Sequence, residues 1–110
     1  MKMSVAQVDA SLAGPENRFA WLEAQVRQAA KEDVDLMVFP ELFMSGYNVG
    51  EALHQYAEAQ NGPFARSVGA LANELSIAIA FGYPERDGET IYNAFIFIDD
   101  QGRTLANHRK

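Results

Sequence analysis

The sequence predicts an α/β domain built on a mixed β-sheet that helices cover on one face. Residues 3 to 39 carry a strand pattern, a helix pattern and a second strand pattern in that order. Such an order implies a right-handed crossover between two parallel strands. A second helical pattern begins at Pro63, and the last third alternates strands with turns. That alternation is typical of an antiparallel meander.

Composition limits the possible partners and compartments. At 110 residues the chain is one domain at most, or part of a larger one. Hydrophobic residues make up 48% of the chain, enough to form a core, and the net charge of −6 argues against a nucleic-acid partner. No apolar run approaches the ~20 residues of a membrane span. The N-terminus is too polar for a signal peptide, so we expect a cytoplasmic protein.

Cysteine is absent from the chain. This excludes disulfides, a thiolate metal site and a thiol nucleophile within these residues. The two histidines, His54 and His108, are isolated from each other in the sequence. We therefore expect no metal site.

The first strand is predicted over residues 3–8, and a loop of small residues follows it. The next helix begins at Pro15 or is capped by Asn17, and the sequence does not decide between the two. Its apolar stripe repeats every three or four residues, at Phe19, Leu22, Val26, Ala29 and Ala30. Charged residues fall largely off that stripe: Arg18, Glu23, Arg27 and Lys31.

The second strand occupies residues 34–39, and a loop is predicted from Leu42 to Gly50. A short helix is expected over residues 51–60, with Leu53, Tyr56 and Ala57 on its inner side. The helix that Pro63 opens has a clear stripe of Phe64, Val68, Leu71 and Leu75.

Three further strands complete the sheet. They are expected over residues 76–83 and 90–98 and from Arg103 onward, with turns at Asp87-Gly88 and at residues 99–102. The strand 91–98 is apolar on both alternating faces except at Asn93. Because the predicted helices can cover only one face of the sheet, we expect something outside this chain to cover the other.

Glu41 is the candidate catalytic residue. It follows the buried strand 34–39 directly, and ligand sites in α/β sheets lie beyond the carboxyl ends of strands. Pro40 fixes the backbone before it, and the apolar neighbours would partly desolvate the carboxylate. Desolvation raises a carboxyl pKa toward the range of a general base. The alternative is that Glu41 only occupies a first helical turn, where the helix dipole favours an acid.

Several motifs follow one another along the chain. The run Asp35-Leu36-Met37-Val38-Phe39-Pro40-Glu41, followed by Ser45-Gly46-Tyr47, resembles the glutamate signature of the nitrilase, or carbon–nitrogen hydrolase, superfamily. Its next two strands resemble Phe81-Gly82-Tyr83 and Tyr92-Asn93-Ala94. In that family the catalytic lysine follows an aromatic residue and an arginine, which is similar to His108-Arg109-Lys110 except at His108.

The resemblance implies the N-terminal part of an α-β-β-α sandwich and a Glu–Lys–Cys mechanism without a cofactor. Glu41 would act as general base, Lys110 would stabilise the oxyanion, and a cysteine would attack an amide or nitrile carbon. Tyr47 would line the acyl pocket, although a loop aromatic that only packs on the helix is an equal alternative. Pro40 and Asn93 would be structural residues near the site. Family members form homodimers or larger assemblies, and segments 46–50 and 82–86 look similar to bacterial aliphatic amidases, which favours small linear amides as substrates.

The missing cysteine leaves two interpretations. In the first, residues 1–110 are a partial carbon–nitrogen hydrolase domain, truncated before its nucleophile and inactive alone. In the second, they form a non-catalytic half-domain that acts as a protein-association module. A reading frame that continues past Lys110 to a cysteine would favour the first.

Overall fold

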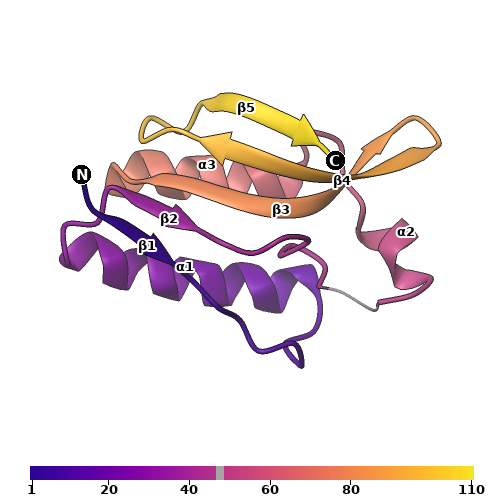
Figure 1. Cartoon of the computed structure of the whole chain (residues 1–110), viewed down its shortest axis with the longest axis horizontal. Helices are drawn as coiled ribbons and strands as arrows, with labels where there is room; N and C mark the ends of the chain where they lie inside the picture. The colour runs from indigo at the N-terminus through magenta and orange to yellow at the C-terminus, as the bar shows by residue number, and fades with distance from the viewer. Residues whose placement is uncertain (47–48) are drawn as a thin grey trace.

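The computed structural model describes residues 1–46 and 49–110, and its centre is a five-stranded mixed sheet (Figure 1). The strands lie side by side in chain order: β1 (Met3–Val5), β2 (Leu36–Val38), β3 (Ala78–Asp87), β4 (Thr90–Ile98) and β5 (Thr104–Arg109). The pairs β1–β2 and β2–β3 are parallel, and β3–β4 and β4–β5 are antiparallel. The prediction of an α/β domain with a mixed sheet is confirmed.

Two long helices, α1 (Pro15–Lys31) and α3 (Pro63–Leu75), cover one face of this sheet and pack against each other (Figure 1). Phe19 and Phe64 meet edge to face between them, with ring centroids 5.7 Å apart. Pro15 occupies the first turn of α1 after Gly14, which decides between the two predicted starts. No helix in the described parts of the chain is long and apolar enough to cross a membrane.

The core lies between the helices and the sheet. Leu22 and Val26 of α1 are buried, as the predicted stripe requires. They face the side of the sheet that carries Ile79 and Phe81 of β3, both fully buried. The stripe of α3 is likewise buried, apart from Leu75 at its end.

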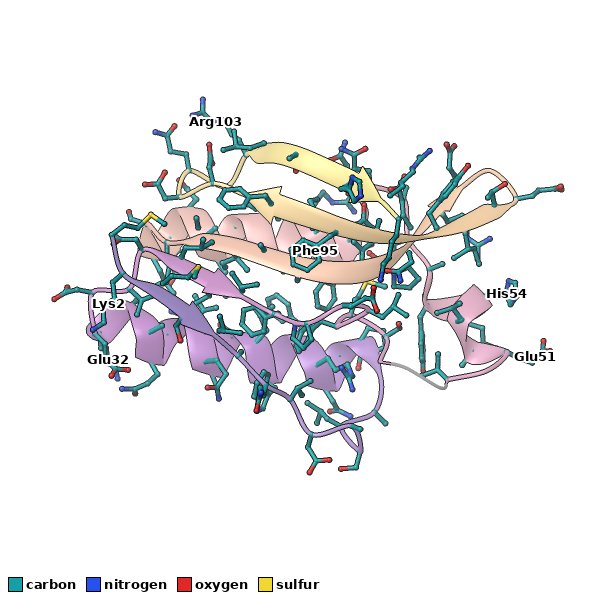
Figure 2. All side chains as sticks on the ribbon, in the orientation of Figure 1. Lys2, Glu32, Glu51, His54, Phe95 and Arg103 are labelled. Carbon is teal, nitrogen blue, oxygen red and sulfur yellow. The ribbon has the colours of Figure 1, made fainter. Side chains whose placement is uncertain are left out.

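The opposite face of the sheet has no helix over it among the described residues. Side chains alternate along β4, so Phe95 and Phe97 point away from the buried Ala94 and Ile96 and are partly exposed. Figure 2 shows Phe95 on this open face. On β1, Met3 and Val5 expose 57% and 66% of their surface. The helices therefore cover one face only, as predicted.

Several element boundaries differ from the prediction by one residue or more. The strand β1 ends at Val5, although the Ala6 N–H still donates to the Val38 carbonyl. The short helix α2 (Ala52–Tyr56) is half as long as expected because Ala57 leaves the helical conformation. The strand β3 continues through Pro84, whose nitrogen faces away from β4, since the N–H groups of Gly82 and Arg86 also point away from it. A proline can occupy such a position without breaking a ladder.

Candidate active site

Glu41 lies in a tight turn that follows β2 and rests against β3. The Phe39 N–H donates to the Ala80 carbonyl at 2.8 Å, and the Gly82 N–H donates to the Pro40 carbonyl at 3.1 Å. The Met44 N–H then donates to the Gly82 carbonyl at 3.1 Å. The turn is thus bonded to β3 on both sides of Glu41, which restricts where its carboxylate can lie.

Gly82 permits this close approach. A methyl group at position 82 would lie 2.7 Å from Glu41 Cα and would also collide with the Leu42 nitrogen. Real side chains do not tolerate such contacts with backbone, so only glycine fits here. Gly82 belongs to a motif that the sequence singled out, but its contact with Glu41 was not predicted.

Lys110 approaches the same point from the end of β5. Its backbone N–H donates to the Asn93 carbonyl at 2.8 Å, which keeps it paired with β4. Its Nζ lies 2.5 Å from Glu41 Oε1. The Lys110 side chain is 70% exposed and that of Glu41 is 33% exposed, so the ion pair sits at an open surface. The structure therefore brings together two predicted site residues that are 69 positions apart.

Two of the other predicted residues, Pro40 and Asn93, lie beside this ion pair. Pro40 precedes Glu41 and accepts the Gly82 N–H, and Asn93 is partly buried beside Lys110. Tyr47, the predicted pocket residue, lies outside the described residues.

A buried polar cluster on the helix-facing side supports β5. Glu85 of β3 is 2% exposed, and its Oε2 lies 2.5 Å from Nη2 of Arg109. Asn107 donates to Glu85 Oε1 at 2.7 Å, and the Tyr83 hydroxyl contacts Asn107 Oδ1 at the same distance. The bonds from Arg109 hold the pKa of Glu85 below its ordinary value despite burial. Burial and the nearby Glu85 charge raise the pKa of Tyr83.

Arg18 is the main correction to the sequence analysis, which had placed it off the buried stripe. It is 3% exposed, and its guanidinium donates to the carbonyls of Leu12 and Phe43, each at 2.8 Å. Burial lowers its pKa. It connects the loop after β1 to the turn that carries Glu41. Its spacing held a signal, because Arg18 lies four residues before Leu22 on the same helical face.

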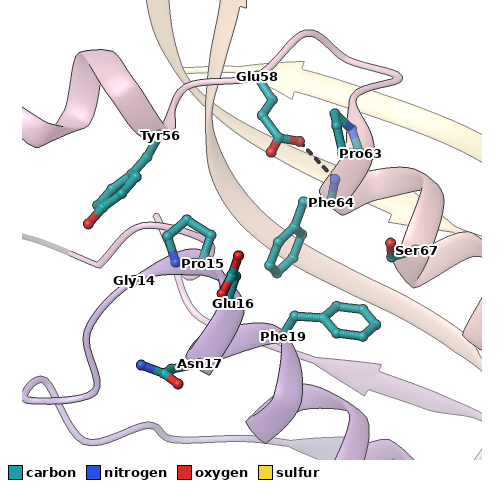
Figure 3. A pocket seen from close by; sticks show the side chains of 10 residues that line it. All are labelled: Gly14, Pro15, Glu16, Asn17, Phe19, Tyr56, Glu58, Pro63, Phe64 and Ser67. Atoms are coloured by element: carbon teal, nitrogen blue, oxygen red, sulfur yellow. Dashed lines mark hydrogen bonds between the residues drawn. The ribbon is translucent and has the colours of Figure 1, made fainter.

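Three hollows lie near these elements. One, of about 690 Å³, lies between the starts of α1 and α3 and is lined by Phe19, Tyr56 and Phe64 among others (Figure 3). There Glu58 accepts the Phe64 N–H at 2.8 Å, and neither Glu41 nor Lys110 lines it. A second, of about 480 Å³, is lined by residues at the ends of β1 and β2, including Pro40. A third, of about 300 Å³, is lined by Arg18, Ser45 and Gly46 among others. The second and third hollows therefore adjoin the turn that carries Glu41.

Comparison with known proteins gives a consistent result. Residues 2–110 match the family profile described as Carbon-nitrogen hydrolase. A Pseudomonas protegens protein named as a hydrolase in the pqqF 5′ region is 52% identical over 91 residues, which are 78% of this chain and 32% of that protein. A bifunctional nitrilase/nitrile hydratase from Lupinus angustifolius is 34% identical over 76% of this chain and 29% of its own length.

Among solved structures, an amidase from Nesterenkonia sp. superposes with a TM-score of 0.87 at 22% identity. The alignment covers all of this chain and 42% of that amidase, so the chain spans less than half of the relatives to which it is similar. Another structure of the Nesterenkonia amidase contains acrylamide added to its active-site cysteine. The similarity in structure supports a shared fold for the sheet and helices described above.

Proposed function

Because the chain belongs to the carbon–nitrogen hydrolase family, we propose that it is the N-terminal part of a hydrolase that cleaves non-peptide C–N bonds in small amides or nitriles. The observation that carries this proposal is the contact of Lys110 Nζ with Glu41 Oε1 at 2.5 Å. An acid and a cation held together at the carboxyl end of a parallel strand are suited to general-base catalysis and oxyanion stabilisation.

In the proposed reaction, a cysteine from outside these residues supplies the nucleophile. Glu41 takes the thiol proton, and the thiolate attacks the amide carbon. Lys110 stabilises the negative charge that develops on the substrate oxygen. Glu41 returns its proton to the leaving nitrogen, so that ammonia departs and a thioester forms. Glu41 then takes a proton from water, whose oxygen attacks the thioester. It passes that proton to the sulfur as the C–S bond breaks, so that the acid product leaves and the cysteine thiol is regenerated.

The open face of the sheet supports the proposal that residues 1–110 are part of a larger domain. Phe95, Phe97, Met3 and Val5 lie on that face and are partly or largely exposed. Isolated domains bury such apolar sheet faces under a second layer. The chain spans 42% of the Nesterenkonia amidase, and a remaining segment of comparable size could supply both that layer and the cysteine. By itself the chain is then expected to be inactive.

The substrate and assembly are part of the same proposal. Small linear aliphatic amides are the proposed substrates, with no cofactor required. The complete protein is proposed to be a cytoplasmic homodimer or larger oligomer. Tyr47 remains a proposed contact to the acyl group of the substrate.

The proposal is tested with a chimera in which this chain replaces the matching segment of the Pseudomonas protegens relative, the one that is 52% identical. Ammonia release is measured with a panel of aliphatic amides and nitriles. The chimera is expected to release ammonia, whereas residues 1–110 alone are expected to release none. Turnover by the chain alone would show that it does not need an external thiol. A folded chimera without activity on any member of the panel would contradict the proposed reaction class.

A further inference from the structure

A buried carboxylate that the proposed reaction does not use lies behind the strand that carries Lys110. Glu85 exposes only 2% of its surface, and it accepts bonds from two residues of β5, Asn107 and Arg109. These two residues are 22 and 24 positions away in sequence. A buried charge needs such partners. Here both partners lie at the end of β5 that leads to Lys110.

The cluster spans three strands. Glu85 is on β3, its partners are on β5, and β4 runs between them. The small side chain of Ala94 faces the same side from β4, which leaves room for the contact of Tyr83 with Asn107 at 2.7 Å. Arg109 also lies over the ring of Tyr92, at 4.2 Å from its centroid, and its Nη2 contacts Asp87 at 3.0 Å. The Arg109 side chain is thus held from several directions.

Arg109 immediately precedes Lys110. Successive side chains in a strand point to opposite faces, so fixing Arg109 on the helix-facing side directs Lys110 to the open face. The Lys110 side chain is 70% exposed, so it has few contacts of its own that would hold it. A flexible lysine side chain loses substantial entropy when it is restricted to one geometry. Anchoring the backbone from which it extends reduces the number of geometries open to it.

We propose that Glu85 is a positioning residue that, through Arg109 and Asn107, orients the end of β5 and so places the Lys110 ammonium against Glu41. The importance of this placement for catalysis rests on the proposed function. The placement itself can be measured on this chain without any hydrolysis. A failure of the one is therefore distinguishable from a failure of the other.

The test is zero-length carbodiimide cross-linking of Glu41 to Lys110, read by peptide mass spectrometry on monomeric chain. The reagent joins a carboxylate to an amine only when the two are in contact. Glu85→Gln removes the buried charge while it keeps the side-chain shape. The matched control is Asp99→Asn at the other end of the β4–β5 hairpin, where Asp99 accepts bonds from the backbone of Gln101 and Arg103.

Glu85→Gln is expected to lower the Glu41–Lys110 cross-link several-fold in chain that still melts cooperatively, while Asp99→Asn leaves the cross-link at the wild-type level. If Glu85→Gln does not fold, Asn107→Ala, which removes one partner of Glu85, is expected to lower the cross-link as well. An unchanged cross-link in folded Glu85→Gln chain would overturn the proposal. So would an equal loss in Asp99→Asn, because the effect would then follow general stability of the hairpin.

Discussion

Gly82 lies directly against Glu41, with no room for a side chain between β3 and the turn that follows β2. A methyl group at position 82 would approach Glu41 Cα to 2.7 Å. The same glycine exchanges backbone hydrogen bonds with Pro40 and Met44 on either side of the turn. The position of the candidate base is therefore fixed by a residue without a side chain.

Substitution of Gly82 by alanine is expected to displace the turn that carries Glu41. The added methyl meets backbone, which cannot rotate aside, so we expect a loss of about 1–3 kcal/mol in the free energy of unfolding. Urea denaturation measures that loss. The control is Gly88→Ala in the β3–β4 turn, where a methyl would meet no atom within 4 Å, although its φ of 63° adds some backbone strain. A smaller loss for Gly82→Ala than for this control would contradict the steric argument.

Replacement of Arg18 by methionine is expected to loosen the same turn from the other side. The carbonyls of Leu12 and Phe43 would lose their donors, at a cost of about 1–3 kcal/mol for each carbonyl that stays buried. Chemical denaturation of the variant measures this cost.

Arg27→Met on the same helix is the matched control for Arg18. Arg27 forms an exposed ion pair with Glu74 at 2.6 Å, and exposed pairs contribute little to stability. The control is therefore expected to lose much less stability than Arg18→Met. Equal losses for the two variants would mean that burial of Arg18 does not determine its contribution.

Glu85 should make stability depend on pH at the acid end. Its pKa in the folded protein lies below the ordinary value of 4.5, chiefly because Arg109 bonds the charged form. A lowered folded pKa contributes stability that is complete above the ordinary pKa and is lost as the pH falls through the folded pKa. The wild type should therefore have a larger free energy of unfolding than Glu85→Gln. This difference should be constant near neutral pH and shrink below pH 4.5.

Urea denaturation at a series of pH values measures this difference between the two proteins. Comparing the difference, rather than either curve alone, removes the contribution of other carboxylates with lowered pKa values, such as Asp99. A wild-type advantage that stayed constant or grew down to about pH 3 would contradict the assigned role of the Arg109 bond.

The sequence was sufficient to predict the sheet and its helices because the apolar periodicities of α1 and α3 are regular. The stripe at Leu22 and Val26 faces the core, and strands that are neighbours in the sequence are also neighbours in the sheet. Strand ends were less predictable. The continuation of β3 past Pro84 depends on which side its nitrogen faces, and that is set by the pairing of β3 with its neighbours.

Local motifs pointed to the candidate site residues. The tertiary contacts that position these residues left no such pattern in the sequence. Glu41 and Lys110 were identified from local motifs, and the fold brings them together. The roles of Gly82, Arg18 and Glu85 come from contacts between segments far apart in sequence. Arginine is rarely buried, so the residue type of Arg18 predicts an exposed position even though its spacing fits the buried stripe.

From their contact we infer that Glu41 and Lys110 act together in catalysis. Kinetics of the chimera with the Pseudomonas protegens relative test this inference most directly. The values of kcat/KM for Glu41→Gln and Lys110→Met are compared with those of the unmodified chimera and of Lys31→Met, a control in the last turn of α1. We predict losses of roughly 10²–10⁴-fold for the two site variants and none for the control. An active chimera whose kcat/KM is unchanged by either site variant would contradict the assignment of this pair to catalysis.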